Sequence, residues 1–423
     1  MARRRQTHSR STLEGAGEIL SLIATGLASS RAELLNFSGL SRATVTQRLN
    51  ALLESQLVRE TEKTLPSGGR PTRTLAVDPA SGFLLVANIG ETHIHVAAMD
   101  LGPAIIAQST LSFSVDQGPN SILKQMEDAF EALARQAQQT HGLFTGISLS
   151  LPTPVDFKRG LVVGPSVLTG WDEFDIIGRL TQRFSVPVYV ENDVNLMTIF
   201  EHKRRFPPAE DMLFVKIGTG IGSGMMSGGR LFRGAQGAAG DIGHIQFLSE
   251  DAPLCRCGKF GCVEARAAGW AVARDLSALG IPAENARDVI NLAQQRIPEA
   301  LMLLRAAGRT IGEVISDVVS IINPSLIVVG GTLAQGGELL LSGIRELVYQ
   351  RCLPLATRDL TIVLSTETED SALFGAAYLL LGDVFSPGKV GLVLERFAAR
   401  SASDKSRTAE PSKKPRPRRS PGN

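Results

Sequence analysis

The sequence has few cysteines and no long apolar run, and these absences argue against two classes of protein. Only four of the 423 residues are cysteine, far fewer than a disulfide-stabilised secreted protein uses, so we expect a reducing, cytoplasmic setting. No run of 18 or more apolar residues occurs, and we therefore expect no membrane-spanning helix. The arginines at residues 3–5 are not followed by an apolar segment, which predicts that no signal peptide is present.

An excess of charge of one sign is also missing. The 44 lysines and arginines nearly balance the 42 aspartates and glutamates, and the net charge of +2 indicates nothing about nucleic acid by itself. Basic residues gather instead at the two ends, in an arm over residues 1–11 and in a tail over residues 400–423. The tail is rich in Ser, Pro, Lys and Arg without apolar periodicity, so it is predicted to be disordered. Its charges either contact DNA phosphates or are only solvated, and both interpretations stay open.

Three of the four cysteines lie within eight positions of one another, close to a histidine. These residues are His244, Cys255, Cys257 and Cys262. Three thiolates and one imidazole form a complete tetrahedral ligand set for zinc, and closed sites of this kind are structural. The spacing therefore predicts a structural Zn²⁺ site in a loop over residues 244–264, although three ordinary core cysteines remain the alternative. The fourth cysteine, Cys352, stands alone and is predicted to be a small buried hydrophobic residue.

Residues 12–79 predict a small domain of three helices followed by two short strands. Apolar residues at helical spacing indicate the first helix: Ile19, Leu20, Ile23 and Leu27. Ser30 followed by Glu33 has the capping-box pattern, which predicts the start of a second helix. The apolar residues of that helix are Leu34, Leu35 and Phe37. After a tight turn at Ser38-Gly39, Ser41 is predicted to cap a third helix. The inward stripe of this helix is Val45, Leu49 and Leu52.

Two helices joined by a short glycine turn are typical of the helix-turn-helix, whose second helix enters the DNA major groove. The predicted stripe leaves Thr44 and Gln47 pointing outward, where short polar side chains reach base edges. Arg42 in the first turn is predicted to hold a phosphate, and Arg48 lies at the margin of the stripe. A three-helix bundle with a solvated polar face is the alternative interpretation.

Residues 57–62 and 73–77 predict two strands joined by a tip that contains Gly68-Gly69-Arg70-Pro71. Strands in this position are typical of a winged helix-turn-helix. An arginine held between glycine and proline suits a narrow A·T-rich minor groove, where the electrostatic potential is most negative. Arg70 is therefore predicted to contact DNA, with an ordinary exposed hairpin tip as the alternative.

Residues 80–390 alternate apolar strands with helical stretches, which predicts an α/β architecture. The expected strands are residues 83–87, 94–98, 146–151, 186–190, 212–217, 326–329 and 362–364, with a helix over 121–138. Asn192 and Asp193 follow a strand end, where α/β folds place ligands. Asp193 there either accepts a hydrogen bond from a sugar hydroxyl, acts as a general base, or is an ordinary turn residue. A glycine-rich turn over 218–224 offers amides to a phosphate, although such turns are common.

The segments 237–245 (Gly-Ala-Ala-Gly-Asp-Ile-Gly-His-Ile) and 255–264 (Cys-x-Cys-Gly-x-x-Gly-Cys-x-Glu) resemble the signature of the ROK family of repressors, open reading frames and kinases. The resemblance spans residues 12–385. It implies a two-lobed, actin-like and hexokinase-like α/β domain, preceded by a winged helix-turn-helix domain that we class as all-α. It also implies a sugar bound between the lobes and a structural zinc. The implied sugar contacts are Asn192, Asp193, Asp241, His244 and Glu264, and the implied zinc ligands are His244, Cys255, Cys257 and Cys262. One ring nitrogen of His244 would then face the metal and the other the sugar.

The sequence departs from the kinase pattern at the phosphate-binding turn. Family kinases have Asp-x-Gly-Gly-Thr-Lys there, whereas this chain has Asn88-Ile-Gly-Glu91-Thr-His93. Asn88 removes a carboxylate from the surroundings of the metal, and Glu91 adds negative charge where polyphosphate should lie. Two unit charges about 4 Å apart repel by roughly 4 kcal/mol at an intermediate dielectric. On the sugar side, Val167 replaces an asparagine and Asp241 a longer glutamate, so the ligand is expected to differ from an ordinary hexose.

Taken together, these features predict a sugar-responsive transcriptional regulator with a degenerate ATP site, in which Asp193 is a vestigial base. The expected protein is a repressor of carbohydrate uptake or catabolism genes. It is expected to bind double-stranded operator DNA as a homodimer or higher homo-oligomer, with a sugar or sugar derivative as effector. The alternative is an active ATP-dependent sugar kinase with an appended DNA-binding domain. A third interpretation is a regulator controlled by a protein partner.

Overall fold

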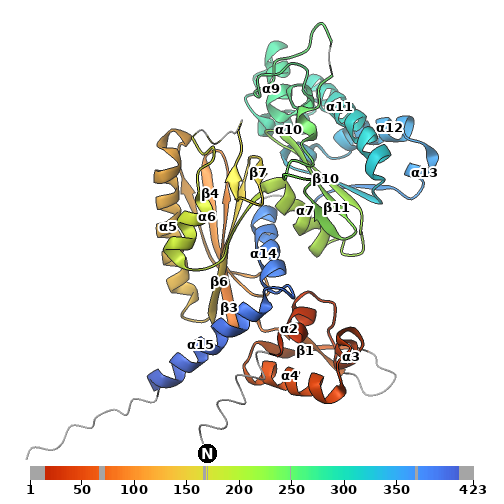
Figure 1. Ribbon diagram of the computed structural model, residues 1–423. Coiled ribbons are helices and arrows are strands. Elements are labelled where there is room, and N and C mark those ends of the chain that lie inside the picture. Colours follow the sequence, from red (N-terminus) through yellow and green to blue (C-terminus); the bar gives the residue numbers. More distant parts are fainter. Residues whose placement is uncertain are drawn as a thin grey trace, which may run out of the picture. The chain divides into compact units, whose positions relative to one another are not determined.

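The computed structural model describes residues 15–65, 72–164, 168, 170–247, 249–366 and 370–408 (Figure 1). The basic arm, Arg70, Val167 and the tail beyond residue 408 lie outside the described residues. The chain divides into two compact units. Unit 1 comprises residues 1–83, 140–145 and 381–423, and unit 2 comprises residues 84–139 and 146–380. Within the described ranges, none of the helices combines the length and the hydropathy needed to cross a bilayer.

Unit 1 contains the three helices and the hairpin that the sequence predicts. They are α2 (Gly17–Ala24), α3 (Arg31–Ser38), α4 (Arg42–Glu54), β1 (Val58–Leu65) and β2 (Thr72–Val77), followed by the short 3-10 helix η1 (Pro79–Ser81). The strands pair antiparallel, with Val58 opposite Val77 and an irregularity between Glu60 and Thr64. The domain is therefore helical with a two-stranded sheet, so the all-α label omits the hairpin.

Serine caps start both helices of the helix-turn-helix. The Ser30 hydroxyl accepts from the Glu33 amide at 3.2 Å, and the Ser41 hydroxyl accepts from the Thr44 amide at the same distance. Glu33 reaches back to the amide of Ser29 at 2.7 Å, and this hydrogen bond holds the pKa of its carboxyl below the ordinary value. Gly39 ends α3 in the left-handed region, φ +64°, where glycine is least strained. Both predicted caps are confirmed.

Seven of the ten predicted core residues of this module are buried, Leu35 is half-buried, and Leu27 and Phe37 are exposed. The buried ones are Ile19, Leu20, Ile23, Leu34, Val45, Leu49 and Leu52. Leu27 is 59% exposed because α2 ends at Ala24, before another turn can bring it to the inner face. Phe37, near the end of α3, is 61% exposed. The first helix is therefore shorter than the apolar spacing predicts.

A C-terminal helix, α15 (Val390–Thr408), belongs to the same unit and was not predicted. Its apolar residues at helical spacing are Val390, Val393, Leu394 and Phe397, all buried. Arg396 donates to the carbonyls of Phe144 and Thr145 at 2.6 and 3.1 Å, and burial lowers the pKa of its guanidinium. The helix continues to Thr408, so the predicted disordered tail, which begins at residue 400, was placed too early.

Two five-stranded sheets, ordered β5-β4-β3-β6-β9 and β12-β11-β10-β13-β14, lie in unit 2 except for the first residues of β3 and β6. The strands of the first sheet are β3 (Gly82–Ile89), β4 (His93–Asp100), β5 (Ile105–Ser112), β6 (Leu143–Leu151) and β9 (Val188–Asn192). Those of the second are β10 (Met212–Ile217), β11 (Ile221–Ser227), β12 (Arg230–Phe232), β13 (Leu326–Gly330) and β14 (Thr361–Leu364). A small pair, β7 (Val155–Asp156) and β8 (Leu161–Val162), stands apart. Every strand predicted for residues 80–390 is present, which confirms the α/β fold.

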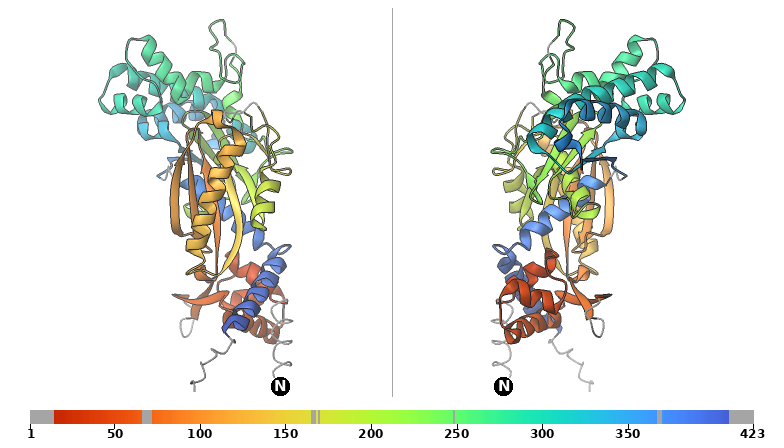
Figure 2. Two further views of the ribbon diagram at one scale, coloured as in Figure 1. Left: turned by 90° about the vertical axis from the view of Figure 1, so that its left-hand side faces the viewer. Right: turned by 90° about the vertical axis from the view of Figure 1, so that its right-hand side faces the viewer.

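Helices between residues 118 and 384 pack against these sheets or against one another. They are α5 (Gly118–Ala137), α6 (Ile176–Phe184), α7 (Asp193–Arg204), α8 (Val263–Ala267), α9 (Gly269–Ala278), α10 (Ala286–Gln294), α11 (Pro298–Ile322), α12 (Glu338–Arg351), α13 (Pro354–Thr357) and α14 (Ser371–Val384). Short 3-10 turns are η2 (Val115–Gln117), η3 (Ile242–His244) and η4 (Thr332–Gly336). Helices α11 and α12 lie side by side (Figure 2). A Cβ on Gly308 would meet the Leu340 carbonyl at 2.3 Å, so glycine permits this close approach.

Candidate functional site

Strand β11 is the scaffold around which the predicted sugar ligands meet. A Cβ added to Gly222 would lie 3.1 Å from Val194 of α7, and one added to Gly224 would lie 2.1 Å from the Thr198 hydroxyl. On the same strand, the Ser223 amide donates to the Gly240 carbonyl at 2.9 Å. The glycines thus let α7 and the 240–244 segment approach one strand. This brings the chain segments of Asp193, Asp241 and His244 together.

The predicted glycine loop over 218–224 is wrong in its extent. Only residues 218–220 form a turn, since Ile221 begins β11, which pairs with β10 from Ile221 opposite Ile217 onward. The Gly218 amide donates to the Gly220 carbonyl at 2.9 Å. Gly222 and Gly224 are strand residues selected by packing against α7, so their amides are not gathered in a phosphate-binding loop.

The Glu264 carboxylate binds the end of the turn over residues 218–220. Its Oε2 accepts from the Ile221 amide at 3.1 Å. A Cβ on Gly220 would lie 2.7 Å from the same carboxylate oxygen, which explains the glycine there. Glu264 stands in the first turn of α8, where the helix dipole favours a carboxylate. One of its oxygens is therefore committed to the fold.

Most of the hydrogen-bonding capacity of the Asn192 side chain is used within the fold. Its side-chain oxygen accepts from the amides of Val194 and Asn195 at 3.0 and 3.3 Å, which caps α7. Its side-chain nitrogen donates to the Thr153 carbonyl at 3.1 Å. Only one hydrogen on that nitrogen is left for a ligand.

Asp193 is the first residue of α7, and its carboxylate is ion-paired. Its Oδ2 lies 2.5 Å from Nζ of Lys216, and its Oδ1 accepts from the Val194 amide at 2.8 Å. The Asp193 side chain is 11% exposed and the Lys216 side chain is 30% exposed. Lys216 was not among the predicted site residues. A lysine in a strand pattern is usually read as solvent-facing, and its partner lies 23 positions away in the sequence.

A second buried ion pair lies beside it and was also missed. Glu191, at 2% exposure, accepts from Nε of Arg233 at 2.6 Å and from the side-chain nitrogen of Asn195 at 2.9 Å. Arg233 also lies over the Phe157 ring, 5.2 Å from its centroid. Buried charges need such partners because desolvation is costly. This pair ties the end of β9 to the segment that follows β12.

Asp241 differs from the other predicted ligands because it is exposed. Its carboxylate has no hydrogen-bond or ion-pair partner among the described residues. It precedes η3, which ends at His244. Of the predicted sugar ligands, Asp241 is thus the one whose carboxylate is wholly available to a ligand.

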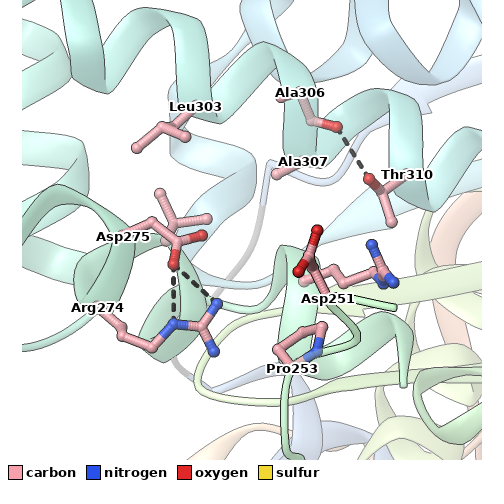
Figure 3. Close-up of a pocket in the computed structure, with 10 residues that line it drawn as sticks. Asp251, Pro253, Arg274, Asp275, Leu303, Ala306, Ala307 and Thr310 are labelled. Atoms are coloured by element: carbon pink, nitrogen blue, oxygen red, sulfur yellow. Dashed lines mark hydrogen bonds and ion pairs between the residues drawn. The ribbon is translucent and has the colours of Figure 1, made fainter. Parts of the chain in front are cut away.

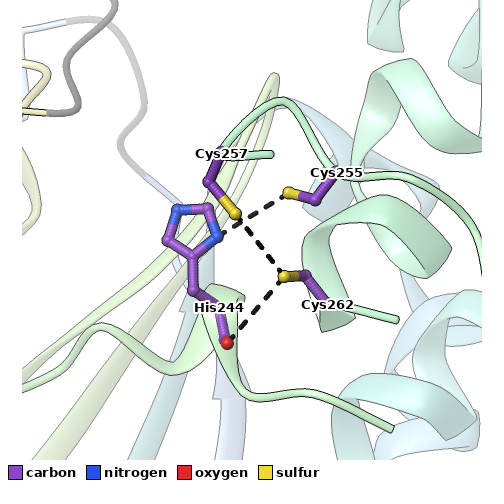
Figure 4. Close-up of side chains that lie close together, drawn as sticks. All are labelled: His244, Cys255, Cys257 and Cys262. Carbon is purple, nitrogen blue, oxygen red and sulfur yellow. Dashed lines mark hydrogen bonds between the residues drawn. The ribbon is translucent and has the colours of Figure 1, made fainter. Parts of the chain in front are cut away.

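The four predicted metal ligands converge (Figure 4). One donor atom from each of His244, Cys255, Cys257 and Cys262 lies within 4.8 Å of all the others. Nδ1 of His244 lies 3.7 Å from the Cys255 sulfur, and the Cys257 and Cys262 sulfurs are 3.7 Å apart. The imidazole Nε2 points away from the sulfurs in Figure 4. This geometry leaves Nε2 without a sulfur partner, and the sugar contact that the resemblance implies for His244 stays a prediction.

Backbone pairing and burial shape this cluster. The Phe247 amide donates to the Gly261 carbonyl at 2.8 Å and the Val263 amide to the Ile245 carbonyl at 3.0 Å, which brings Cys262 beside His244. Burial raises the pKa of the Cys255 thiol and raises that of Cys262 to about 12. For Cys257, hydrogen bonds led by the Lys259 amide outweigh burial and lower the pKa. Buried thiols facing one another suit a cation that takes them as thiolates.

The turn predicted to repel ATP is a tight hairpin between β3 and β4. The Gly90 amide donates to the His93 carbonyl at 2.8 Å, and Glu91 is exposed at the tip. Through water, two charges 4 Å apart interact by only about 1 kcal/mol. The repulsion expected from Glu91 is therefore weaker than the sequence suggests.

The predicted DNA-contact residues do not share one face of α4. Arg42 and Gln47 are exposed, together with Thr46 and Asn50, which were not predicted. Thr44 is half-buried, and its hydroxyl lies 2.9 Å from that of Ser41. Arg48 faces α2 instead, with its Nη1 3.5 Å from Glu18. A hollow of about 300 Å³ between α3 and α4 is lined by residues that include Arg31 and Arg42.

Another hollow, of about 320 Å³, lies in unit 2 (Figure 3). Asp251, Arg266, Arg274 and Thr310 are among its lining residues. Two of its charges pair with each other, since Nε of Arg274 donates to Asp275 at 2.8 Å, and Nη2 of Arg266 donates to the Phe247 carbonyl at 3.0 Å. None of the predicted sugar ligands lines it.

Cys352, the remaining cysteine, is 8% exposed, and its sulfur donates to the Ser316 carbonyl at 3.4 Å. The prediction of a small buried residue is confirmed.

A helix-turn-helix module followed by an α/β body of two five-stranded sheets is the architecture of a regulator built on a sugar-kinase-like fold. Residues 85–383 match the ROK family. The chain belongs to the ROK family.

Known proteins of two kinds are similar to this chain. A xylose repressor from Caldicellulosiruptor bescii is 25% identical over 371 residues, covering 84% of this chain and 92% of that protein. A glucokinase from Halalkalibacterium halodurans is 26% identical over 309 residues, covering 69% and 93%. A solved ROK family transcriptional regulator, a homologue of the E. coli MLC protein, superposes with a TM-score of 0.77 at 23% identity, covering 92% of this chain and all of that one. The last comparison establishes the fold.

Proposed function

We propose that this protein is a sugar-responsive, DNA-binding transcriptional regulator, with repression as the expected sign. The observation that carries the proposal is the extent of the similarity. The xylose repressor matches 84% of the chain, a larger share than residues 85–383 make up, whereas the glucokinase matches 69%. The similarity to the repressor therefore reaches beyond the sugar-kinase-like body, toward the helix-turn-helix module that a sugar kinase does not need.

The proposed effector is a sugar or sugar derivative bound near β11. Asp241 offers a free carboxylate, His244 offers Nε2, and Asn192 keeps one amide hydrogen. Charged and polar groups of this kind bind hydroxyls with direction. Glu264 and Asp193 each have one oxygen bound by a backbone amide, so they present the sugar with rigid rather than mobile acceptors.

His244, Cys255, Cys257 and Cys262 would hold a structural zinc ion. The donor set is complete without a water, which is typical of a structural rather than a catalytic site. The ion would fix the 244–264 loop, and with it His244 and Glu264. Zinc would therefore support sugar binding without taking part in any reaction.

Regulation requires that the sugar bind unequally to two arrangements of the protein. We infer a homodimer that presents two α4 helices to a palindromic operator, about one turn of DNA apart. Sugar binding in unit 2 would shift the population of arrangements and so change operator affinity.

Replacing either exposed polar residue of α4 should weaken operator binding. Arg42→Ala and Gln47→Ala each remove a contact worth about 1–3 kcal/mol, so the dissociation constant should rise roughly 5- to 150-fold. Fluorescence anisotropy with labelled operator DNA measures this. Arg287→Ala is the matched control, because it removes the same charge from an exposed site on α10. If the control weakens binding as much as Arg42→Ala does, α4 is not the recognition helix.

Arg70 lies outside the described residues, and its contact with the minor groove stays a prediction. Arg70→Ala should reduce affinity for operators with an A·T-rich flank more than for those with a G·C-rich flank. Equal loss on both DNAs would indicate a phosphate contact instead.

The alternative function is an ATP-dependent sugar kinase with Asp193 as base. ATP consumption with D-glucose and D-xylose, alongside Asp193→Asn, separates the two. We expect the unmodified protein to consume ATP no faster than the Asp193→Asn variant does.

Mapping of bound DNA across the genome should place the protein at promoters beside carbohydrate transport or catabolism genes.

A further inference from the structure

Lys216 is a charged residue in the otherwise apolar strand β10. Along β10, Met212 and Phe214 point toward α7, where they pack with Val194 and Met197 in one apolar cluster. Because side chains alternate along a strand, Lys216 points to the same face. An ammonium therefore stands where two preceding positions are apolar and fully buried.

The neighbouring strands leave space for this side chain. In register beside Lys216 are Gly222 on β11 and Gly330 on β13. Neither glycine has a side chain to crowd the lysine stem. The ammonium extends to the N-terminal end of α7 and reaches Oδ2 of Asp193 at 2.5 Å.

Both oxygens of the candidate base are consequently engaged by donors. Oδ1 accepts from the Val194 amide at 2.8 Å, and Oδ2 is held by the ammonium. A general base must take a proton from the reacting hydroxyl. Because each oxygen of Asp193 already accepts from a donor, a sugar hydroxyl can donate to the carboxylate only beside the ammonium or the amide, and Lys216 competes with it for Oδ2.

We propose that Lys216 is a positioning residue that keeps Asp193 as a sugar acceptor and prevents it from acting as a catalytic base. The inference rests on the proposed function, and it names a second obstacle to phosphoryl transfer besides Asn88 and Glu91. That obstacle matters because Glu91 is exposed at a hairpin tip, where its charge is screened by water.

The test restores the phosphate-binding turn of the family kinases in two variants, one that keeps Lys216 and one that replaces it. One variant carries Asn88→Asp and Glu91→Gly, and a second adds Lys216→Met, which keeps the length of the stem without its charge. ADP release is measured with ATP, Mg²⁺ and either D-glucose or D-xylose. In the restored reaction the sugar oxygen attacks the γ-phosphorus of ATP, the bond to ADP breaks, and the hydroxyl proton passes to Asp193.

We expect the triple variant to turn over at least tenfold faster than the double variant. Lys216→Arg in place of Lys216→Met should keep the low rate, because the cation is retained, and adding Asp193→Asn should abolish the gain. Melting temperatures check that all variants fold. Equal rates in the double and Met triple variants, whether high or undetectable, overturn the inference. Turnover by the unmodified protein would instead overturn the proposed function, so the two failures are distinguishable.

Discussion

Cys257→Ser should lose the bound zinc and, with it, most of the response to sugar. Structural zinc binding in zinc-finger peptides is worth about 10–16 kcal/mol, and three remaining ligands recover only part of such an energy. Loss of several kcal/mol should lower the melting temperature by about 10 °C. Zinc per chain, by metal analysis of the purified protein, should fall from one to near zero. Cys257 is half-buried, whereas the other two cysteine ligands are buried, so serine should disturb packing least there.

Cys352→Ser is the control for this experiment. It alters a buried cysteine that bonds to the Ser316 carbonyl and lies outside the ligand cluster. It should keep one zinc per chain and an unchanged sugar response. If the Cys257→Ser protein keeps one zinc per chain and the melting temperature of the unmodified protein, the cluster is not a structural zinc site.

Asp241→Ala should weaken sugar binding without destabilising the protein. A hydrogen bond from a ligand to a charged group is worth about 1.5–3 kcal/mol, so the dissociation constant should rise roughly 10- to 100-fold. The carboxylate is exposed and has no partner among the described residues, so its removal leaves no buried group unpaired. Titration calorimetry with D-xylose and D-glucose measures the affinity.

Asn192→Ala provides the contrast for this prediction. Asn192 caps α7 through two amides, and loss of a cap costs about 1 kcal/mol of stability. This variant should lower both the melting temperature and the sugar affinity. If Asp241→Ala binds sugar normally, the sugar does not contact the 240–244 segment.

The features predicted well from the sequence are those set by neighbouring residues. Ser30 and Ser41 cap their helices because each hydroxyl bonds an amide three positions on. The cysteines of the metal cluster lie within one short loop. The strands of the body follow from continuous apolar runs. In each case the physical cause lies within a few residues of its effect.

The features that were missed depend on contacts distant in the sequence. Gly222 and Gly224 look like loop residues until α7 is seen to pack on them. Lys216 looks like a surface lysine until Asp193 is placed beside it. Arg48 looks like a DNA contact until α2 brings Glu18 within reach. Tertiary packing therefore decides the role of each residue where local pattern allows several.

Operator affinity with and without sugar tests the central claim most directly. Labelled DNA from a mapped binding site is titrated with the full-length, zinc-loaded protein, in the absence of sugar and with saturating D-xylose or D-glucose, and without ATP. We expect one of the sugars to change the dissociation constant at least tenfold, and Asp241→Ala to require more sugar for the same change. An operator affinity that neither sugar alters, in a protein that binds one of them by calorimetry, would contradict a sugar-responsive regulator.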